Sequence, residues 1–372
     1  MCPLAEILHS KGYILTGSDN NESDPLKRVR NLGVKVSMGH SAENVHGCEL
    51  VVYSAAISKD NPELVEAQRL GIPTMERSLL LGALTRKYDN VIGVSGTHGK
   101  TTVTSMITQI LYLNKMEPTA VIGGRLPLLN SNGIAGTSET MVCEACEFVD
   151  TFLQMSPDIA VLLNIDNDHL DYFKTMDNLV LSFHKFLKMS SKAYINGDDE
   201  LALKASEDID AKIITFGFED KNDYYAKNIK PSKFGFSFDV YNEDKKIINI
   251  ELRAPGRHNV LNALAAFSVC FEEGVSPEGI KNAIEQFTGA GRRFEFLGEY
   301  NGFTLADDYA HHPSEIQSTL NSIRNLKRRK IAIFQPHRYT RLKGLWNEFL
   351  DSFDAIDKLY VIDVFCAGDK PL

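Results

Sequence analysis

The stretch GTHGKTT, which begins at Gly96, combines groups that can bind a polyphosphate. Gly96 and Gly99 let backbone N–H groups approach an anion, Lys100 adds a positive charge, and Thr101 offers a hydroxyl for Mg²⁺. In the usual phosphate loop, four residues separate a first glycine from Gly-Lys-Ser/Thr, and that first glycine would fall at Val94. The stretch therefore predicts a phosphate-binding loop with shortened spacing.

The segments on either side of this loop have the order that a phosphate site requires. NVIGVS reads as a β-strand, and apolar residues after the loop recur at helical spacing from Val103 to Leu111. A strand, a glycine-rich turn and a helix N-terminus together direct N–H groups and a positive dipole toward an anion. A glycine-rich surface turn is the alternative, and the flanking elements favour phosphate binding.

Two polar residues are expected near the same loop. Glu144 ends the predicted strand ETMVCE, and His169 follows IAVLLNI at 159–165, whose lack of alternation suits a strand buried on both faces. Ligands gather beyond the carboxyl ends of parallel strands, so both side chains should face the crevice of Lys100. A carboxylate beside phosphates implies a bridging cation, although either residue alone could be an ordinary loop residue.

A second group of polar residues lies in APGRHNVLNALAA. Asn259 and Asn262 are three residues apart at the start of a predicted helix, so they share a face. Their amide groups could read the edge of an adenine base. The alternative is that Asn259 only caps the helix.

Further clusters come later in the chain. Arg292 and Arg293 precede a third predicted unit, where they could contact phosphate when domains close. His311 and His312 are adjacent, but no carboxylate or cysteine is spaced to complete a zinc site with them. Cys143 and Cys146 form a C-x-x-C without a second pair, and we interpret both as small buried side chains.

The charge and composition exclude several classes of protein. With 40 basic and 49 acidic residues the net charge is −9, which argues against broad nucleic-acid binding. No apolar run approaches the roughly 18 residues of a membrane helix, so no membrane partner is expected. The six cysteines are scattered, as in a reducing compartment, and a cytoplasmic enzyme is predicted.

Strands alternating with helices predict an α/β protein with parallel sheets. At 372 residues the chain is longer than one ordinary core. We predict three units, at residues 1–88, 89–294 and 295–372.

GTHGKTT resembles the ATP loop of the Mur ligases, ATP-dependent enzymes that join amino acids to the UDP-muramyl precursor of peptidoglycan. That family has a shortened loop with His or Asn before Gly-Lys, which accounts for Val94. The resemblance implies that ATP is bound by the loop, by the two asparagines and by one arginine, namely Gly96, Thr97, His98, Gly99, Lys100, Thr101, Thr102, Asn259, Asn262 and Arg293.

The resemblance also implies a magnesium site and a set of catalytic residues. Thr101, Glu144 and His169 match the family's Mg²⁺ ligands, and Glu147 matches a second acid near the reacting groups. Cys146 departs from the pattern, because many members have Asp there. The catalytic set implied in this way is Lys100, Glu144, Glu147, His169 and Arg338.

The outer units carry matching segments as well. Asp19, His40 and Ser54 resemble residues of the UDP-sugar site. The DDYAHHPSEI and FQPHRYTR motifs resemble a region that closes over ATP and receives the amino acid, with the candidate residues His311, His312, Arg338 and Arg341.

The resemblance implies a three-domain architecture, with a truncated Rossmann-like N-terminal domain, a central P-loop ATPase-like domain with a parallel sheet, and an incomplete Rossmann-like C-terminal domain. The implied reaction uses ATP and Mg²⁺ to join L-alanine to the lactyl carboxylate of UDP-N-acetylmuramic acid through an acyl phosphate. The alternatives are a recycling relative that attaches a peptide, or a non-catalytic nucleotide-binding fragment. Family members have a first strand, a glycine-rich loop and a C-terminal segment that this chain lacks, so we expect a nearly complete ATP site and an impaired UDP-sugar site.

Overall fold

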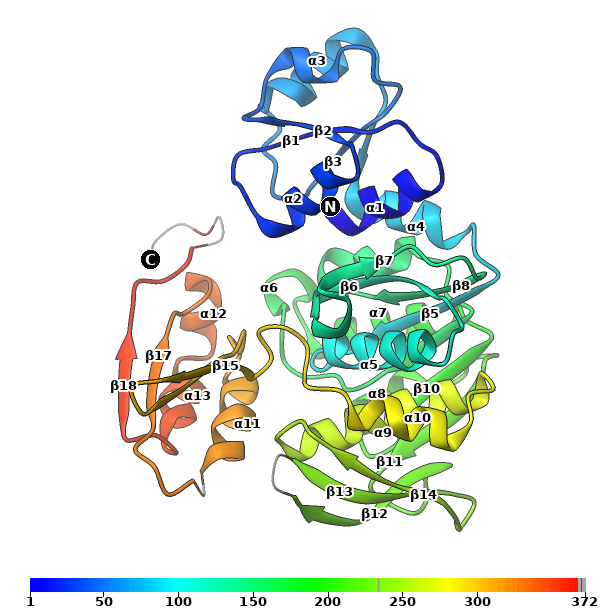
Figure 1. Cartoon of the computed structure of the whole chain (residues 1–372), viewed down its shortest axis with the longest axis vertical. Helices are drawn as coiled ribbons and strands as arrows, with labels where there is room; N and C mark the ends of the chain where they lie inside the picture. Colours follow the sequence, from blue (N-terminus) through cyan, green and yellow to red (C-terminus); the bar gives the residue numbers. More distant parts are fainter. Residues whose placement is uncertain (233–234, 325, 367–368, 370–372) are drawn as a thin grey trace.

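The structure is a computed structural model that describes residues 1–232, 235–324, 326–366 and 369. The last three positions of the predicted third unit, 370–372, lie outside the described residues. Figure 1 shows three bodies: the N-terminal part lies above a large central unit, and the C-terminal part lies beside it.

The central unit is built on a ten-stranded sheet with the order β14-β13-β12-β11-β10-β9-β5-β8-β6-β7. The strands from β12 to β6 in this order are parallel, whereas β7, β13 and β14 run antiparallel to their neighbours. The bounds are β5 Asn90–Ser95, β6 Thr119–Leu126, β7 Ser131–Ile134, β8 Thr140–Glu144, β9 Ile159–Leu162, β10 Lys192–Asn196, β11 Lys212–Gly217, β12 Tyr224–Pro231, β13 Phe236–Asn242 and β14 Lys245–Leu252.

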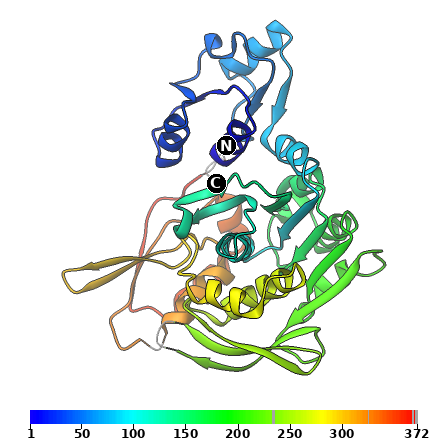
Figure 2. The same cartoon turned by 45° about the vertical axis from the view of Figure 1, so that its right-hand side comes forward.

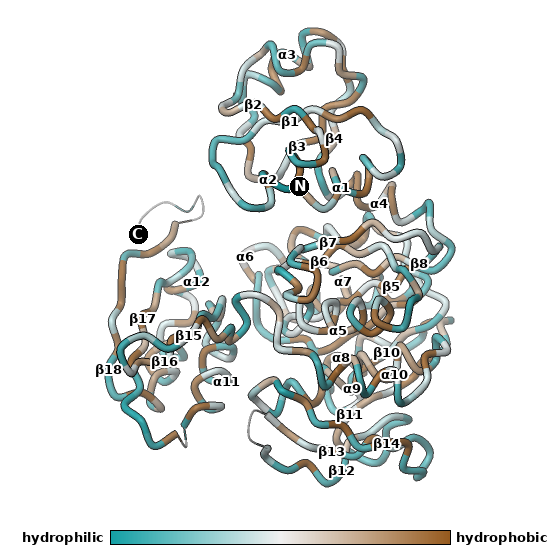
Figure 3. The backbone as a smooth tube through the Cα atoms, in the orientation of Figure 1, coloured by the Kyte–Doolittle hydropathy of each residue, from teal (hydrophilic) through white to brown (hydrophobic). Residues whose placement is uncertain are grey.

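Helices cover both faces of this sheet, and each face has its own apolar core. One core includes residues of α5, α9 and α10, and the other includes residues of α4, η3, α7 and α8. Figure 3 shows hydrophobic segments running through this central unit. The bounds are α4 Arg77–Thr85, α5 Lys100–Leu113, η2 Pro127–Leu129, η3 Phe148–Gln154, α6 Leu170–Phe173, α7 Met176–Leu187, α8 Glu200–Ala205, α9 Arg257–Glu272 and α10 Pro277–Glu285.

The strand arrangement brings the predicted polar residues to one edge. Strand β9 lies between β5 and β10, and its four residues are all buried, as the apolar run predicted. Strand β8 pairs with the other side of β5. The loop after β5, Glu144 at the end of β8 and the segment after β9 therefore leave neighbouring strands at the same edge.

The N-terminal unit has two parallel strand pairs, β1 with β2 and β3 with β4. Its first helix serves the neighbouring unit as well, because Leu4 and Ile7 are buried in the core on one face of the central sheet. The bounds are α1 Cys2–Ser10, β1 Thr16–Asp19, α2 Asp24–Asn31, β2 Lys35–Met38, η1 Ala42–Val45, β3 Val51–Tyr53, α3 Pro62–Leu70 and β4 Thr74–Glu76.

The C-terminal unit contains an antiparallel hairpin and a parallel pair. The hairpin joins β15 Glu295–Tyr300 to β16 Phe303–Asp307, and Figure 2 shows it projecting from the molecule. Its turn is Asn301-Gly302, with φ of 49° and 81°, the type that matches strand twist. The other elements are α11 Pro313–Ile323, β17 Ile331–Phe334, α12 Tyr339–Gly344, α13 Trp346–Leu350, η4 Asp351–Phe353 and β18 Lys358–Val361.

The C-terminal unit has a small apolar core of its own. Ile316 and Leu320 of α11 are buried in it together with Phe349 of α13. The next residue, Leu350, is 63% exposed. The chain forms three short helices here, α12, α13 and η4, so its apolar residues do not share one helical face.

Candidate active site

The glycine-rich loop joins β5 to α5. Val94 is a fully buried residue of β5, so the position of the usual first glycine belongs to the strand. Gly96 and Gly99 have φ of 134° and 87°, a region that favours glycine. A Cβ atom at Gly99 would lie 2.7 Å from Oδ1 of Asn262, so a larger residue would also collide.

Lys100 points back into the loop and toward an acid. Its Nζ donates to the carbonyl oxygens of Gly96 at 2.5 Å and Thr97 at 3.1 Å, and to the two carboxylate oxygens of Glu147 at 2.9 and 3.1 Å. Burial lowers the pKa of Lys100, but the charge of Glu147 outweighs it and the pKa is raised. Lys100 is therefore charged and held among oxygen atoms.

Glu144 and Thr101 border the same pair of glycines in β6. Glu144 accepts a hydrogen bond from the backbone N–H of Gly123 at 2.9 Å, and any side chain at Gly123 would collide with its carboxylate. A Cβ at the next residue, Gly124, would lie 3.0 Å from Cγ2 of Thr101. The absence of side chains at these two glycines thus lets the Glu144 carboxylate and the Thr101 methyl group lie directly against the backbone of β6.

His169 is also near this group of residues. Its Nε2 lies 3.9 Å from Oε1 of Glu147 and 3.5 Å from Oδ2 of Asp168. Burial lowers the pKa of His169, so the neutral imidazole, which can bind a cation, is favoured. Glu147, rather than Glu144, is the acid that contacts both Lys100 and His169.

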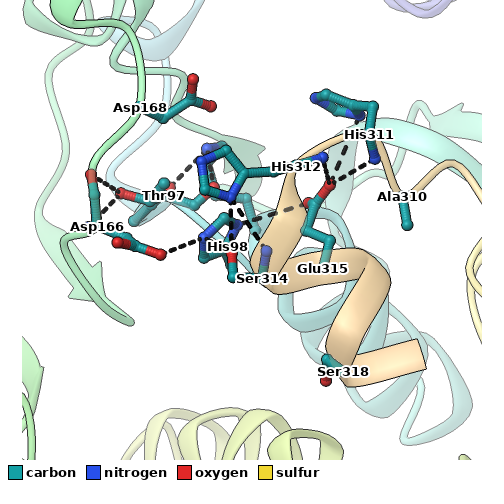
Figure 4. Close-up of polar contacts among 12 residues, drawn as sticks. Thr97, His98, Asp166, Asp168, Ala310, His311, His312, Ser314, Glu315 and Ser318 are labelled. Carbon is teal, nitrogen blue, oxygen red and sulfur yellow. Dashed lines mark hydrogen bonds and ion pairs between the residues drawn. The ribbon is translucent and has the colours of Figure 1, made fainter. Parts of the chain in front are cut away.

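His98 lies in a network that joins the central and C-terminal units (Figure 4). Its Nε2 is 3.1 Å from Oδ2 of Asp166 and 3.0 Å from Oγ of Ser314, and its Nδ1 is 3.6 Å from Oε1 of Glu315. Burial lowers the pKa of His98, but the hydrogen bonds to Asp166 and Glu315 outweigh it and raise the pKa to about 9. The ring nitrogens of His98 therefore face the side chains of Asp166, Ser314 and Glu315 in this structure.

Folding brings His312 close to two residues that are far from it in the sequence, His98 and Asp166. His312 has possible ligand atoms within 4.8 Å of those of His98 and Asp166. All three side chains are already engaged, because His312 Nε2 is 3.0 Å from the carbonyl oxygen of Asn167 and His98 is bonded to Asp166. These hydrogen bonds, one of which crosses between the central and C-terminal units, explain why the three side chains lie close together.

Asn259, Asn262 and Arg293 line a cavity of about 270 Å³ that also reaches Gly99 and Thr102. The two amides contact each other, with Asn262 Nδ2 donating to Asn259 Oδ1 at 3.0 Å. Asn259 lies near the N-terminus of α9, as the capping alternative expected, but it is the third residue of the helix and does not cap it: the N-cap is Gly256, and no side chain caps it. The side chain of Asn259 donates from Nδ2 to the carbonyl oxygen of Pro255 at 2.6 Å.

A second cavity of about 200 Å³ is lined by Asp168, His169, Arg338 and Arg341. Arg341 Nη2 donates to Oδ1 of Asp168 at 3.3 Å, which joins α12 to the segment after β9. Arg338 Nη2 donates to Oδ1 of Asp369 at 3.0 Å. This second cavity adjoins the Glu147 group through His169.

The remaining candidates lie elsewhere. His311 is not among the residues that line the two cavities; its Nδ1 lies 2.8 Å from the carbonyl oxygen of Tyr309. In the N-terminal unit, His40 Nδ1 is 3.1 Å from Ser18 Oγ, Asp19 accepts from the N–H of Asn21, and Ser54 accepts from the N–H of Ala56.

The prediction that Cys143 and Cys146 are both buried is correct for Cys143 alone. Cys143 is buried in β8, but Cys146 is exposed, because the chain leaves the sheet after Glu144. Within the described residues both thiols are free.

Four residues that contact the loop were not predicted: Asn164, Asp166, Ser314 and Glu315. The side chain of Asn164 accepts from the N–H of His98 at 2.8 Å and donates to its carbonyl at 3.0 Å. The segment NIDND after a buried strand was a usable signal for Asn164 and Asp166. Ser314 and Glu315 carried no signal beyond a helix start after His312.

Comparisons with known proteins identify the family of this chain. Family models described as "Mur ligase family, catalytic domain", "Mur ligase middle domain" and "Mur ligase, glutamate ligase domain" match residues 1–89, 94–270 and 292–371. A UDP-N-acetylmuramate–L-alanine ligase of Caldicellulosiruptor saccharolyticus is 46% identical over 375 residues, which covers all of this chain and 82% of that protein. The chain belongs to the Mur ligase family. The family resemblance of the loop is thereby confirmed, together with the ligase class.

Other Mur ligases give the same result. The enzyme of the same name from Acetivibrio thermocellus is 43% identical, over all of this chain and 80% of its own length. The crystal structure of UDP-N-acetylmuramate-alanine ligase from Thermotoga maritima superposes with a TM-score of 0.84 at 29% identity, covering 98% of this chain and 83% of that one. A murein peptide ligase from Psychrobacter arcticus, at 23% identity and a TM-score of 0.77, shares the fold. The predicted three-domain α/β architecture is confirmed.

In the part of the chain that the structure describes, we find no helix that combines the length and the apolar character needed to cross a bilayer.

Proposed function

We propose that this Mur ligase joins L-alanine to the lactyl carboxylate of UDP-N-acetylmuramic acid and uses ATP to activate that carboxylate. The relatives with 43% and 46% identity bear the name of this reaction, and they match the whole chain. The observation that carries the proposal is the pairing of Lys100 with Glu147 directly beside a glycine loop and a helix N-terminus. Lys100 provides a positive charge for the phosphates, and the acids next to it suit a cation.

The donor set fits a magnesium ion. Thr101, Glu144 and His169 offer a hydroxyl, a carboxylate and a neutral imidazole, and the Glu144 carboxylate is held in place by the backbone N–H of Gly123. We assign the ion to these three residues. A Mg²⁺ ion held there would neutralise negative charge on the phosphates of ATP.

The protein's own groups then perform two tasks. Lys100 and the N–H groups of the loop orient the triphosphate, while Asn259 and Asn262 hold the adenine base in the larger cavity. In the first step the lactyl carboxylate oxygen forms a bond to the γ-phosphorus, and the bond to the ADP oxygen breaks. In the second step the amine of L-alanine attacks the acyl carbon, phosphate leaves, and the amine loses a proton.

We propose that the second cavity binds L-alanine when the C-terminal unit closes over the site. Arg338 and Arg341 give it two guanidinium groups, which suit the carboxylate of L-alanine. Asp19, His40 and Ser54 are proposed to bind the UDP part of the other substrate. We also propose that the three units divide near residues 88 and 294.

The direct test is product formation. The chain is incubated with ATP, Mg²⁺, UDP-N-acetylmuramic acid and L-alanine, and phosphate release is followed while mass spectrometry looks for the alanyl product. Release that requires both L-alanine and the sugar nucleotide supports the proposal. Product formed with a tripeptide and not with L-alanine would favour the recycling reaction, and nucleotide binding without acceptor-dependent release would favour a non-catalytic module. The identities of the relatives disfavour both alternatives.

A further inference from the structure

Glu315 uses its two carboxylate oxygens for two different purposes. Oε2 accepts from the backbone N–H groups of His311 and His312 at 3.1 and 3.4 Å, which completes a capping box at the start of α11. Oε1 faces the other way, 3.3 Å from Nη1 of Arg293 and 3.6 Å from Nδ1 of His98. One side chain therefore joins its own helix to two elements outside it.

The partners of Oε1 both belong to the nucleotide cavity. His98 directly precedes Gly99 and Lys100 in the glycine loop, and Arg293 lies in the segment between the central and C-terminal units. Both line the larger cavity, as does Glu315 itself. Only 13% of the Glu315 side chain is exposed, so water screens these ionic contacts less than it would at the surface.

Other contacts from the first two turns of α11 reach the same region. Ser314 Oγ is 3.0 Å from Nε2 of His98, and Ser318 Oγ is 2.6 Å from Nδ1 of His258 beside the paired asparagines. Figure 4 shows Ser314 and Glu315 at the start of α11, beside His98. The start of α11 is thus fastened to the loop that carries Lys100.

We infer that Glu315 is a positioning residue that couples docking of the C-terminal unit to the shape of the nucleotide cavity, through its contacts with His98 and Arg293. The inference rests on the proposed function only in naming ATP as the nucleotide. When α11 is docked, the His98 side chain, two residues before Lys100, is held between Asp166 and Glu315. Without the carboxylate, His98 and Arg293 lose the partner that they share at the boundary between the two units.

The chain offers a variant that separates the two purposes. In Glu315→Gln the amide oxygen can still accept from the N–H groups of His311 and His312, because Gln also completes a capping box. The NH₂ group then replaces Oε1 and meets the donors of His98 and Arg293. Glu315→Ala removes both functions, and Asp354→Asn removes an exposed ion pair with Arg324 at the other end of the same helix.

The measurement is calorimetric binding of a non-hydrolysable ATP analogue with Mg²⁺, alongside thermal unfolding. We expect Glu315→Gln to weaken binding about tenfold or more, as for loss of a charged hydrogen bond, with a lower melting temperature but a chain still folded at the temperature of the binding measurement. Asp354→Asn should leave binding unchanged. Because His98→Gln and Glu315→Gln both break the contact between these two residues, the loss of binding in the double variant should be smaller than the sum of the two single losses.

Two results would overturn the inference. The first is a Glu315→Gln chain that binds the analogue within twofold of the unmodified chain. The second is loss of binding only in proportion to loss of folded protein, which would make Glu315 a helix cap and nothing more. Binding is measured without turnover, so absence of ligase activity in the unmodified chain would count against the proposed function and leave this test intact.

Discussion

The ammonium group of Lys100 lies 2.9 Å from the carboxylate of Glu147, and the two side chains are only 13% and 2% exposed. The sequence alone suggests that Lys100→Ala is inactive but folded. This ion pair changes the expectation, since removal of one partner leaves a buried charge. We expect Lys100→Ala to lose activity and also about 3–5 kcal/mol of unfolding free energy, measured by urea denaturation.

A double variant separates these two effects. Lys100→Met with Glu147→Gln leaves no buried charge, so it should be closer to the original stability than Lys100→Ala while remaining inactive in phosphate release. Equal stability of Lys100→Ala and the unmodified chain would contradict the energetic role of this pair.

The contact between the loop and α11 should depend on pH. His98 has a pKa raised to about 9, so its stabilising contribution is complete below the ordinary histidine pKa and is lost as the pH rises through about 9. Asp166 and Glu315 have lowered pKa values; their contributions are present above the ordinary carboxyl range and are lost only in more acidic solution. His312, which also faces this group, has a pKa lowered by burial and stays neutral near pH 7.

The check is thermal unfolding of the unmodified chain and of His98→Gln between pH 6 and pH 10. The difference in melting temperature between the two should be largest near neutral pH and should shrink as the pH passes about 9. A difference that stays constant across this range would show that protonation of His98 does not stabilise the contact.

The paired asparagines give a test of base recognition. Asn262→Ala removes the amide group that donates to Asn259 and lies against Gly99. The side chain of Asn259 and the glycine loop then both lose a contact. Loss of one to two hydrogen bonds corresponds to an increase of about tenfold in the KM for ATP. The KM for L-alanine serves as the internal control, and an equal rise in both constants would point to general damage instead of base recognition.

Arg341 gives a test of the second cavity. Its guanidinium is 8% exposed and bonds Asp168, and its Nε is buried without a hydrogen-bond partner among the described residues. Arg341→Lys keeps the charge but loses the planar fork, so we expect a several-fold increase in the KM for L-alanine with a smaller change for ATP. Lys343→Ala on the same helix is a control. An unchanged KM for L-alanine in Arg341→Lys would remove this residue from the proposed amino-acid site.

The sequence by itself determined the strand, glycine loop and helix around Lys100, because these depend on local spacing and on the freedom of glycine at positive φ. It also determined that β9 is buried on both faces and that Glu144 and His169 leave strands near the loop, since parallel strands end at one edge. The family followed from the loop and from motifs in all three units.

Only the tertiary structure decided which groups meet. The acid bound to Lys100 is Glu147, because the chain turns out of the sheet after β8 and carries this residue back to the loop. His98 is engaged by Ser314, 216 positions away in the chain, through the packing of two units that no local pattern describes. Spacing specifies which face of an element a side chain occupies, whereas the partner on that face depends on how separate units pack against one another.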